Sequence, residues 1–264
     1  MKLKRIVILT SENRRHLAFV DNLNSSKKIE ILAAYIEEKN KTNIIKNKIL
    51  SKHFKKRDQV EKKYFKIKNL STKIKNLNFC ERGYLSSIDC FKMLKDYEPD
   101  LIIVFGTSII KGKIIKYFKD KILNVHLGLS PYYRGSGTNI FPLINNKPEF
   151  VGASIIFLDK GVDTGKIIHQ IRAKFKPNDD VHQIGNRLIK EMFTVFKKII
   201  INFEKIKFIK EINTKNIKYY KKKDFTEESV YVMQKNFKSG MIKNYLKEKK
   251  KRDNKVKLIQ QNWI

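Results

Sequence analysis

Short apolar runs recur along the first half of the chain, and they constrain its fold more than any other feature. Residues 4–10 read KRIVILT, residues 29–36 read IEILAAYI and residues 100–105 read DLIIVF. Runs of this length that are rich in Val and Ile are typical of strands buried on both faces of a parallel sheet. Between the first two runs, apolar residues recur at helical spacing from His16 to Leu23. This order predicts a strand, a helix and a second strand.

The same alternation continues beyond the first unit. Ser11 is expected to cap the first helix, and a second amphipathic helix is expected over residues 88–97, where Pro99 ends it. Residues 109–118 are predicted to be helical, and residues 122–127 form a fourth strand. We therefore expect a Rossmann-like α/β fold, with an open, mostly parallel sheet and helices on both of its faces.

The second half of the chain has a different pattern of predicted secondary structure. Residues 152–158 and 167–175 read as two long strands that could pair as a hairpin, and residues 181–203 as a helix. The apolar side of this helix is expected to hold Ile184, Leu188, Met192, Val195 and Ile199.

The chain is expected to divide at residue 205. Residues 1–205 would form a catalytic domain, and residues 206–264, which are more charged and less regular, a small C-terminal appendage with a helix capped at Thr226. Residues 39–79 are dense in Lys and are read as solvated helices or a variable insertion. No apolar run is long enough to span a membrane, so a soluble, cytoplasmic protein without a membrane partner is expected.

The formal net charge of +32 is the strongest feature of the composition. It is compatible with nucleic acid or with a phosphorylated small molecule as a partner. The basic residues are mostly Lys and are spread along the whole chain, whereas nucleic-acid sites tend to cluster Arg with aromatic residues. Nucleic acid, such as tRNA, is therefore an alternative that is not favoured. Cys80 and Cys90 lack metal-ligand spacing and are read as buried or half-buried side chains.

A pair of polar residues interrupts the fourth predicted strand. Residues 122–131 read ILNVHLGLSP, so Asn124 and His126 share one face of a strand that ends at a Gly and a Pro. Ligands bind beyond the carboxyl ends of strands in such sheets. An Asn amide can donate to a carbonyl oxygen that gains negative charge, and a His can donate to it or move a proton. Such residues are also often ordinary core or turn residues.

An acidic residue in a Gly-flanked loop completes the candidate site. Residues 159–165 read DKGVDTG, and Asp163 could keep an imidazole charged or take a proton from a nucleophile. An ordinary turn is the alternative. No Ser or Cys lies in a nucleophile elbow, and no cluster has metal-ligand spacing, so no metal is expected. Direct transfer of an acyl-like group between two substrates is favoured.

Together these motifs resemble the formyltransferase family that uses 10-formyltetrahydrofolate. The family includes methionyl-tRNA formyltransferase, the sugar N-formyltransferases, glycinamide ribonucleotide transformylase and formyltetrahydrofolate hydrolase. Its strand motif of Asn, any residue and His is matched by Asn124 and His126, and its Asp loop is similar to residues 159–168, DKGVDTGKII. The segment YRG, residues 133–135, also resembles the family, and the resemblance spans residues 4–205.

The resemblance implies a role for each matched residue. Asn124 and His126 would bind the formyl oxygen, and Asp163 would position His126 and help to remove the proton of the attacking amine. It also implies 10-formyltetrahydrofolate as the co-substrate. The segments that correspond to the folate pocket would bind it through Thr107, Ser108, Ile109, Lys111, Phe157, Asp159 and Gly161.

Departures from the family pattern bear on the amine that accepts the formyl group. The Ser-Leu-Leu-Pro turn of the family begins here with Gly128, and residues 10–16, TSENRRH, lack the glycines of a phosphate loop. Arg14 and Arg15 could still clamp a phosphate. A nucleotide-linked amino sugar is the expected acceptor, with methionyl-tRNA, hydrolysis of the donor or a non-catalytic nucleic-acid-binding module as alternatives. A homodimer is compatible with the sequence.

Overall fold

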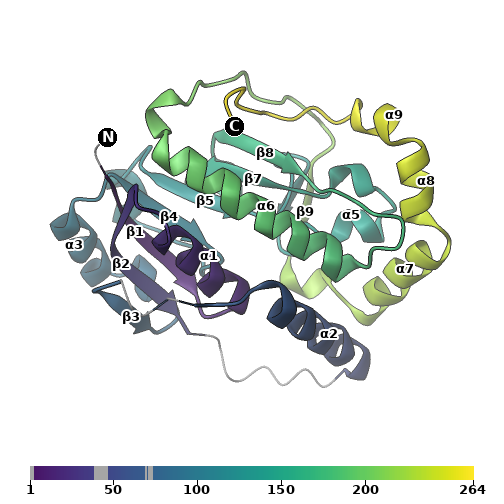
Figure 1. The fold of residues 1–264 in the computed structure, drawn as a ribbon, viewed down its shortest axis with the longest axis horizontal. Helices are drawn as coiled ribbons and strands as arrows, with labels where there is room; N and C mark the ends of the chain where they lie inside the picture. The colour runs from purple at the N-terminus through teal and green to yellow at the C-terminus, as the bar shows by residue number, and fades with distance from the viewer. Residues whose placement is uncertain (1–2, 39–46, 69, 71–73) are drawn as a thin grey trace.

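The computed structural model describes residues 3–38, 47–68, 70 and 74–264. Its centre is a seven-stranded sheet, coloured from purple to green in Figure 1. The strands are β1 (Lys4–Ser11), β2 (Ile29–Glu37), β3 (Leu77–Cys80), β4 (Leu101–Phe105), β5 (Ile122–His126), β7 (Gly152–Phe157) and β8 (Ile167–Arg172). Their spatial order is β3-β2-β1-β4-β5-β7-β8, and the first five are parallel. The antiparallel pairing of β7 with β8 confirms the predicted hairpin.

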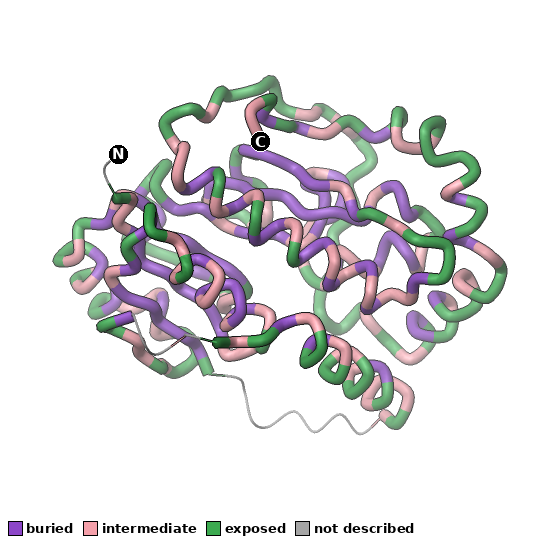
Figure 2. The backbone as a smooth tube through the Cα atoms, in the orientation of Figure 1, coloured by how far each residue is buried: buried purple, intermediate pink, exposed green. Residues whose placement is uncertain are grey.

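Helices cover both faces of this sheet, as the alternation of the sequence predicted. On one face lie α1 (Arg14–Asn24) and α6 (Val181–Ile201), which Figure 1 shows in front of the strands. On the other face lie α3 (Ile88–Tyr97) and α4 (Lys113–Tyr117). Successive residues of a strand point to opposite faces, so Ile8 packs in the cluster that contains α1 and α6, and Leu9 in the cluster that contains α3 and α4. Figure 2 shows the strands as the most deeply buried segments.

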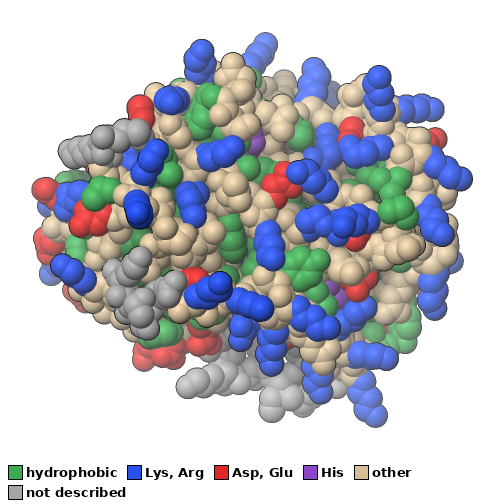
Figure 3. All heavy atoms as spheres, in the orientation of Figure 1, with side chains coloured by type: hydrophobic (Ala, Val, Ile, Leu, Met, Phe, Trp, Pro, Cys, Tyr) green, Lys and Arg blue, Asp and Glu red, His purple; other side chains and the backbone are tan. Residues whose placement is uncertain are grey.

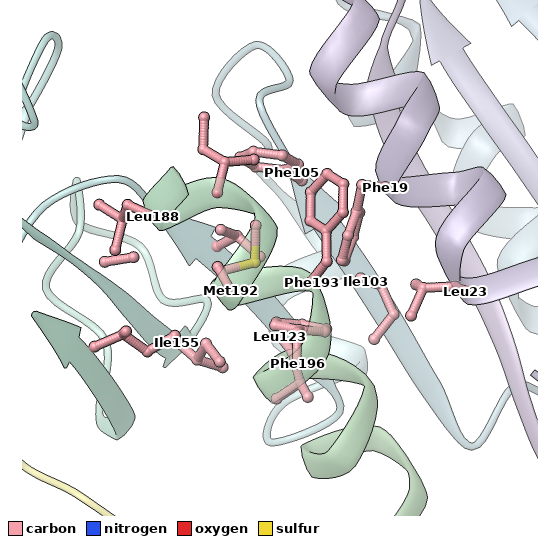
Figure 4. Close-up of a cluster of buried hydrophobic side chains, with 14 of the residues drawn as sticks. Phe19, Leu23, Ile103, Phe105, Leu123, Ile155, Leu188, Met192, Phe193 and Phe196 are labelled. Carbon is pink, nitrogen blue, oxygen red and sulfur yellow. The ribbon is translucent and has the colours of Figure 1, made fainter. Parts of the chain in front are cut away.

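Aromatic side chains join α1 and α6 over the centre of the sheet. The ring of Phe19 lies 5.3 Å from that of Phe193 and 5.4 Å from those of Phe196 and Phe105 (Figure 4). Phe19, Phe196 and Phe105 are almost fully buried, and burial stabilises a side chain of this size by about 1.5 to 3 kcal/mol. The predicted apolar side of α6 is buried except for Val195, which is half-buried because Phe196 occupies the corresponding place in the core.

Several boundaries differ from the sequence-based expectation. Asn13, and not Ser11, precedes α1, because the hydroxyl of Ser11 is hydrogen bonded to Nδ1 of His16 at 2.7 Å. The helix expected over residues 109–118 is shortened to α4, because hydrogen bonds at Ser108 and Lys111, described below, hold the preceding residues as a loop. The Lys-rich segment forms α2 (Lys48–Tyr64) and also supplies β3, which the sequence did not reveal. Residues 39–46, 69 and 71–73 of that segment lie outside the described residues.

The C-terminal residues pack along the main body of the chain. Strand β9 (Lys218–Tyr220) pairs in parallel with β6 (Tyr133–Gly135). The remaining helices are α5 (Phe141–Ile144), α7 (Glu227–Lys238), α8 (Met241–Lys247) and α9 (Lys249–Asp253), with single 3-10 turns at Tyr84–Ser86, Pro148–Phe150, Phe203–Lys205 and Lys222–Asp224. The Thr226 cap of α7 is confirmed. Met233, Met241 and Ile242 belong to the same core cluster as α6.

Basic side chains are scattered over the face drawn in Figure 3, with acidic ones between them. Within the described residues, no helix is long and apolar enough to cross a membrane. Cys90 is buried and Cys80 half-buried, as expected, and neither is in a disulfide. Burial raises the pKa of Cys80 to about 11, which does not favour a thiolate at neutral pH.

Candidate active site

His126 and Asp163, which the sequence assigned to separate segments, are in contact. Nδ1 of His126 lies 3.2 Å from Oδ2 of Asp163, and both side chains are largely buried. Nε2 of His126 lies 2.8 Å from the carbonyl oxygen of Tyr133. The same Oδ2 of Asp163 accepts a hydrogen bond from the backbone N–H of Gly135 at 2.8 Å. Strand β6 therefore contacts both members of the pair.

The partners of the imidazole constrain where its protons can lie. A carbonyl oxygen only accepts, and so does an ionised carboxylate. Both ring nitrogens of His126 face such acceptors, Tyr133 and Asp163. A proton on Nδ1 can therefore be donated to Asp163, and a proton on Nε2 to the carbonyl of Tyr133. The His126–Asp163 contact is thus able to hold a proton and to pass it on.

The loop of Asp163 has to fold back to reach His126. Strand β7 runs antiparallel to β5 and ends at Phe157, which is paired with Leu123 near the start of β5. The loop therefore begins at the opposite end of β5 from His126. Asp163 takes a left-handed conformation with a φ of 53°. Gly165 is needed beside it, because a Cβ there would lie 1.7 Å from the carbonyl oxygen of Phe157. The glycines of DKGVDTG therefore serve the close packing of this loop.

Asn124 lies two residues before His126 on the same face of β5, which is the face of α3 and α4. Its side chain is half-buried. Its side-chain amide has no hydrogen-bond partner among the residues that the structure describes. A neutral donor that the fold does not use is therefore available next to the His126–Asp163 pair.

The turn that follows His126 requires the glycine that departs from the family pattern. A Cβ on Gly128 would lie 2.4 Å from Nε2 of His126 and 2.7 Å from the side chain of Thr138. Such contacts are closer than van der Waals distances allow. The imidazole therefore occupies space that a serine at this position would need.

A buried polar network, which the sequence did not reveal, holds this turn. The hydroxyl of Ser154 donates to the carbonyl of Gly128 at 2.7 Å and accepts from the N–H of Ser130 at 2.9 Å. Gln170, which is fully buried, donates through Nε2 to the carbonyl of Ser130 at 2.6 Å. The Oε1 atom of Gln170 accepts from the N–H of Ile259 at 3.0 Å. The side chain of Gln170 thus links the C-terminal residues to the turn that follows His126.

A buried glutamate holds the first of the predicted folate-binding segments. Glu37, which is 2% exposed, accepts from the N–H of Ser108 at 2.6 Å, from its hydroxyl at 2.5 Å and from the N–H of Gly83 at 2.8 Å. Farther along the loop, the N–H of Lys111 donates to Ser86 at 3.0 Å. These contacts leave the side chain of Ile109 61% exposed. The signal in the sequence was an acidic residue at the end of an otherwise apolar strand.

The second predicted folate-binding segment uses most of its polar groups internally. Asp159 accepts from the N–H of Gly161 at 3.0 Å and from the hydroxyl of Thr164 at 2.7 Å. Thr107, in the first segment, likewise donates to its neighbour Ser108 at 2.7 Å. The ring of Phe157 is buried in the core. The backbone of this segment, and not the Phe157 ring, is what a ligand could contact.

The arginines at the start of α1 both contact α2 or the residue that follows it. Arg15 forms an ion pair with Glu61 of α2 at 2.7 Å, and Arg14 donates to the carbonyl of Phe65 at 3.3 Å. These contacts tie α2 to α1. Arg15 is thereby committed to an ion pair, whereas Arg14 is exposed and uses one guanidinium nitrogen in this way. In the described part of the chain, no group of three or more His, Cys, Asp and Glu side chains has the arrangement of a metal site.

These features define an α/β domain in which the amide of Asn124 and the His126–Asp163 contact lie together at strand β5 of the sheet. The chain belongs to the formyl transferase family, whose model matches residues 4–200. This confirms the family that the motifs on β5 and in the Asp163 loop indicated.

Curated relatives include enzymes with two kinds of acceptor. Methionyl-tRNA formyltransferase of Finegoldia magna is 30% identical over 118 residues, which are 44% of this chain and 38% of the relative. GDP-perosamine N-formyltransferase of Brucella melitensis is 26% identical over 133 residues, 50% of this chain and 51% of the relative. The matched region thus spans about half or less of these relatives.

Solved structures share the fold at low identity. A sugar N-formyltransferase from a Shewanella species has a TM-score of 0.56 and 16% identity, covering 84% of this chain and 78% of that one. Phosphoribosylglycinamide formyltransferase of Anaplasma phagocytophilum has the same score and identity, with coverage of 84% and 100%. The formyltransferase PseJ of Anoxybacillus kamchatkensis, in complex with UDP-4,6-dideoxy-4-formamido-L-AltNAc and tetrahydrofolate, has a TM-score of 0.50 and 19% identity, with coverage of 90% and 95%. These likenesses confirm the α/β fold.

Proposed function

We propose that this protein transfers a formyl group from 10-formyltetrahydrofolate to the primary amine of a nucleotide-linked amino sugar. The observation that carries this proposal is the contact between His126 and Asp163 beside the unused amide of Asn124. Formyl transfer needs a donor to an oxygen that gains negative charge and a group that takes a proton from the attacking amine. The three side chains match these needs.

Each residue of the site has a distinct task in this reaction. The folate supplies the formyl group when it is bound. Asn124 donates a hydrogen bond to the formyl oxygen as the neutral amine attacks the formyl carbon, and imidazolium His126 favours the same negative charge. Asp163 holds the imidazolium and accepts the proton that the amine must lose when its new bond to carbon forms. As the bond between the formyl carbon and the folate nitrogen breaks, the proton taken up at the His126–Asp163 pair is returned to that leaving nitrogen, so the site ends the reaction in its starting protonation state.

The described residues near the site fit a folate donor. The exposed side chain of Ile109 offers apolar surface to a flat aromatic ring, and Glu37 fixes the backbone of the same loop. Lys111 is exposed at the end of this loop, where a cation suits the carboxylates of a folate tail. We propose that Thr107 to Lys111 bind the donor together with the backbone of residues 157–161.

The acceptor is the less constrained part of the proposal. A nucleotide-linked amine is favoured by the similarity to GDP-perosamine N-formyltransferase. Initiator methionyl-tRNA is the second candidate, favoured by the similarity to methionyl-tRNA formyltransferase and by the net charge of +32. We also propose residues 1–205 as the catalytic unit and residues 206–264 as the appendage.

The test is to incubate the protein with 10-formyltetrahydrofolate and, in separate reactions, nucleotide-linked amino sugars, methionyl-tRNA or no acceptor. Mass spectrometry should show one added formyl group on an amino sugar with the wild type and almost none with Asp163→Asn. The matched control is Asp120→Asn, because Asp120 also has a positive φ but is exposed to solvent. This variant should retain activity. Formate release without an acceptor would indicate a hydrolase instead. No transfer to any amine would contradict the proposed reaction.

A further inference from the structure

The pairing of β6 with β9 places an arginine and a tyrosine side by side. Arg134 is the direct partner of Tyr219 in this parallel pair, and paired residues of neighbouring strands project from the same face. The opposite face belongs to the core, because the rings of Tyr133 and Tyr220 stack there at 6.1 Å and Tyr220 stacks on Phe141 at 3.7 Å. The face that carries Arg134 and Tyr219 is therefore the outer one.

This outer face adjoins the catalytic pair. Nε of Arg134 donates to the carbonyl of Val162 at 2.9 Å, one residue before Asp163. The N–H of Gly135 is bonded to the Asp163 carboxylate at 2.8 Å. A Cβ on Gly135 would lie 3.1 Å from Cε2 of Tyr219, so the tyrosine ring lies against this glycine. Arg134 and Tyr219 thus border the place where the amine must approach Asp163.

Neither side chain is fully used by the fold. Tyr219 is 49% exposed, although it is a large ring beside the site. Ile217, two residues earlier in the chain, is 47% exposed. Arg134 is half-buried, and within the described residues its guanidinium is bonded only through Nε, which leaves its terminal nitrogens for a ligand. An exposed ring and a free cation beside an acid–base pair are typical of a binding surface.

We propose that Arg134 and Tyr219 form the subsite that binds the nucleotide part of the acceptor. Tyr219 stacks on the base, and the forked guanidinium of Arg134 pairs with the diphosphate. This proposal rests on the proposed function and names the substrate class as a nucleoside diphosphate derivative. A single exposed ring next to a single arginine matches one base and its phosphates, whereas a strand of RNA requires a longer groove with several aromatic residues.

Binding without turnover tests this subsite directly. Calorimetry would measure the affinity of UDP and of GDP for the wild type and for the variants Tyr219→Leu, Tyr219→Phe and Arg134→Gln. The control is Tyr231→Leu on α7, because Tyr231 is also 49% exposed. Loss of stacking should weaken the binding of one or both nucleotides about tenfold or more in Tyr219→Leu, and Tyr219→Phe and Tyr231→Leu should bind within about threefold of the wild type. Pyrophosphate should bind more weakly to Arg134→Gln and equally to the wild type and Tyr219→Leu.

The outcomes separate this subsite from the proposed reaction. Wild-type affinity for nucleotides in Tyr219→Leu would overturn the subsite, and so would the absence of nucleotide binding by the wild type. Binding only of an RNA hairpin that ends in CCA would also overturn it. If formyl transfer to a nucleotide sugar occurs but its KM is unchanged in Tyr219→Leu, the subsite fails and the reaction stands. If nucleotides bind through Tyr219 and no formyl group is transferred, the reaction fails and the subsite stands.

Discussion

Oδ2 of Asp163 lies 3.2 Å from Nδ1 of His126, and one short strand holds both residues in this contact. The carbonyl of Tyr133 faces the other nitrogen of His126, and the N–H of Gly135 binds the Asp163 carboxylate. Strand β6 is itself paired with β9 from the C-terminal part of the chain. The geometry of the site therefore depends on residues outside the strand and the loop that carry it.

Removing the charge of Asp163 should reduce turnover far more than stability. Asp163→Asn keeps the size of the side chain and loses the carboxylate that faces His126, which we propose as the base. Because positioned acid–base groups contribute typically 10² to 10⁴-fold, kcat for formyl transfer should fall by about 10²-fold or more. Steady-state kinetics at neutral pH would measure this fall, with Asp120→Asn as the control. A kcat within a few-fold of the wild type would show that Asp163 is not the base.

Restoring the serine of the family turn should impair this protein. In Gly128→Ser the new Cβ would lie 2.4 Å from Nε2 of His126, so the imidazole or the turn must move. Overpacking of this kind costs about 1 to 3 kcal/mol, and we expect both a lower Tm and a lower kcat. Gly185→Ala on α6 is the control, because the nearest atom to a Cβ at this position would be 3.4 Å away, which is an ordinary van der Waals distance. Unchanged Tm and kcat in Gly128→Ser would show that the turn adapts freely.

Glu37 should matter for binding of the folate donor. Its carboxylate accepts from the N–H and hydroxyl of Ser108 and from the N–H of Gly83. In Glu37→Gln the amide can replace only part of these bonds, so the free energy of unfolding should fall by about 1 to 3 kcal/mol. The KM for 10-formyltetrahydrofolate should rise, while the KM for the amine should change little. Glu38→Gln, at the adjacent exposed position, should behave as the wild type in the same kinetic and unfolding measurements.

Gln170 should couple the C-terminal residues to the catalytic turn. In Gln170→Leu, the carbonyl of Ser130 and the N–H of Ile259 would both lose their hydrogen bond to the Gln170 side chain. Both groups would remain buried. Two buried groups lose their partner at about 1 to 3 kcal/mol each, so the free energy of unfolding should fall by about 2 to 6 kcal/mol in chemical unfolding. Gln260→Leu removes only the 3.2 Å hydrogen bond that this exposed side chain donates to the carbonyl of Gln170, so it should cost much less. Equal stability of the two variants would contradict a role of Gln170 as the link.

Buried histidines should make the protein acid-sensitive. Burial lowers the pKa of His169 to about 4, and its Nδ1 accepts from the N–H of Gln261 at 3.0 Å, so the neutral ring is required. In the unfolded chain the pKa is about 6.5. The stabilisation is therefore complete above pH 6.5 and is lost as the pH falls from there through about 4, by about 3 kcal/mol for this one ring.

Urea unfolding at a series of pH values measures this loss. Burial also lowers the pKa values of His53 and His182 to about 4, so both contribute in the same direction. His169→Asn, whose amide oxygen can still accept from Gln261, should show a smaller loss over the same range. A pH dependence as steep as that of the wild type would indicate that His169 does not titrate in this way.

The sequence by itself determined six of the seven strands of the central sheet, most of its helices and the candidate residues of the site. The apolar runs of β1, β2 and β4 and the periodicity of α3 and α6 depend on neighbours along the chain, so local patterns were enough to predict them. The polar pair Asn124 and His126 was visible because it interrupts such a run. The pairing of this strand with the Asp163 loop came from the resemblance to a family and not from spacing.

Only the tertiary structure decided how these residues are held. The contacts of Glu37 with Ser108, of Gln170 with Ser130 and of β6 with β9 join segments that are far apart in the sequence. Such contacts depend on how loops fold back and on which buried polar groups find partners, and no periodicity encodes either. The fold of the backbone followed from local chemistry, whereas the geometry of the His126–Asp163 pair followed from long-range packing around it.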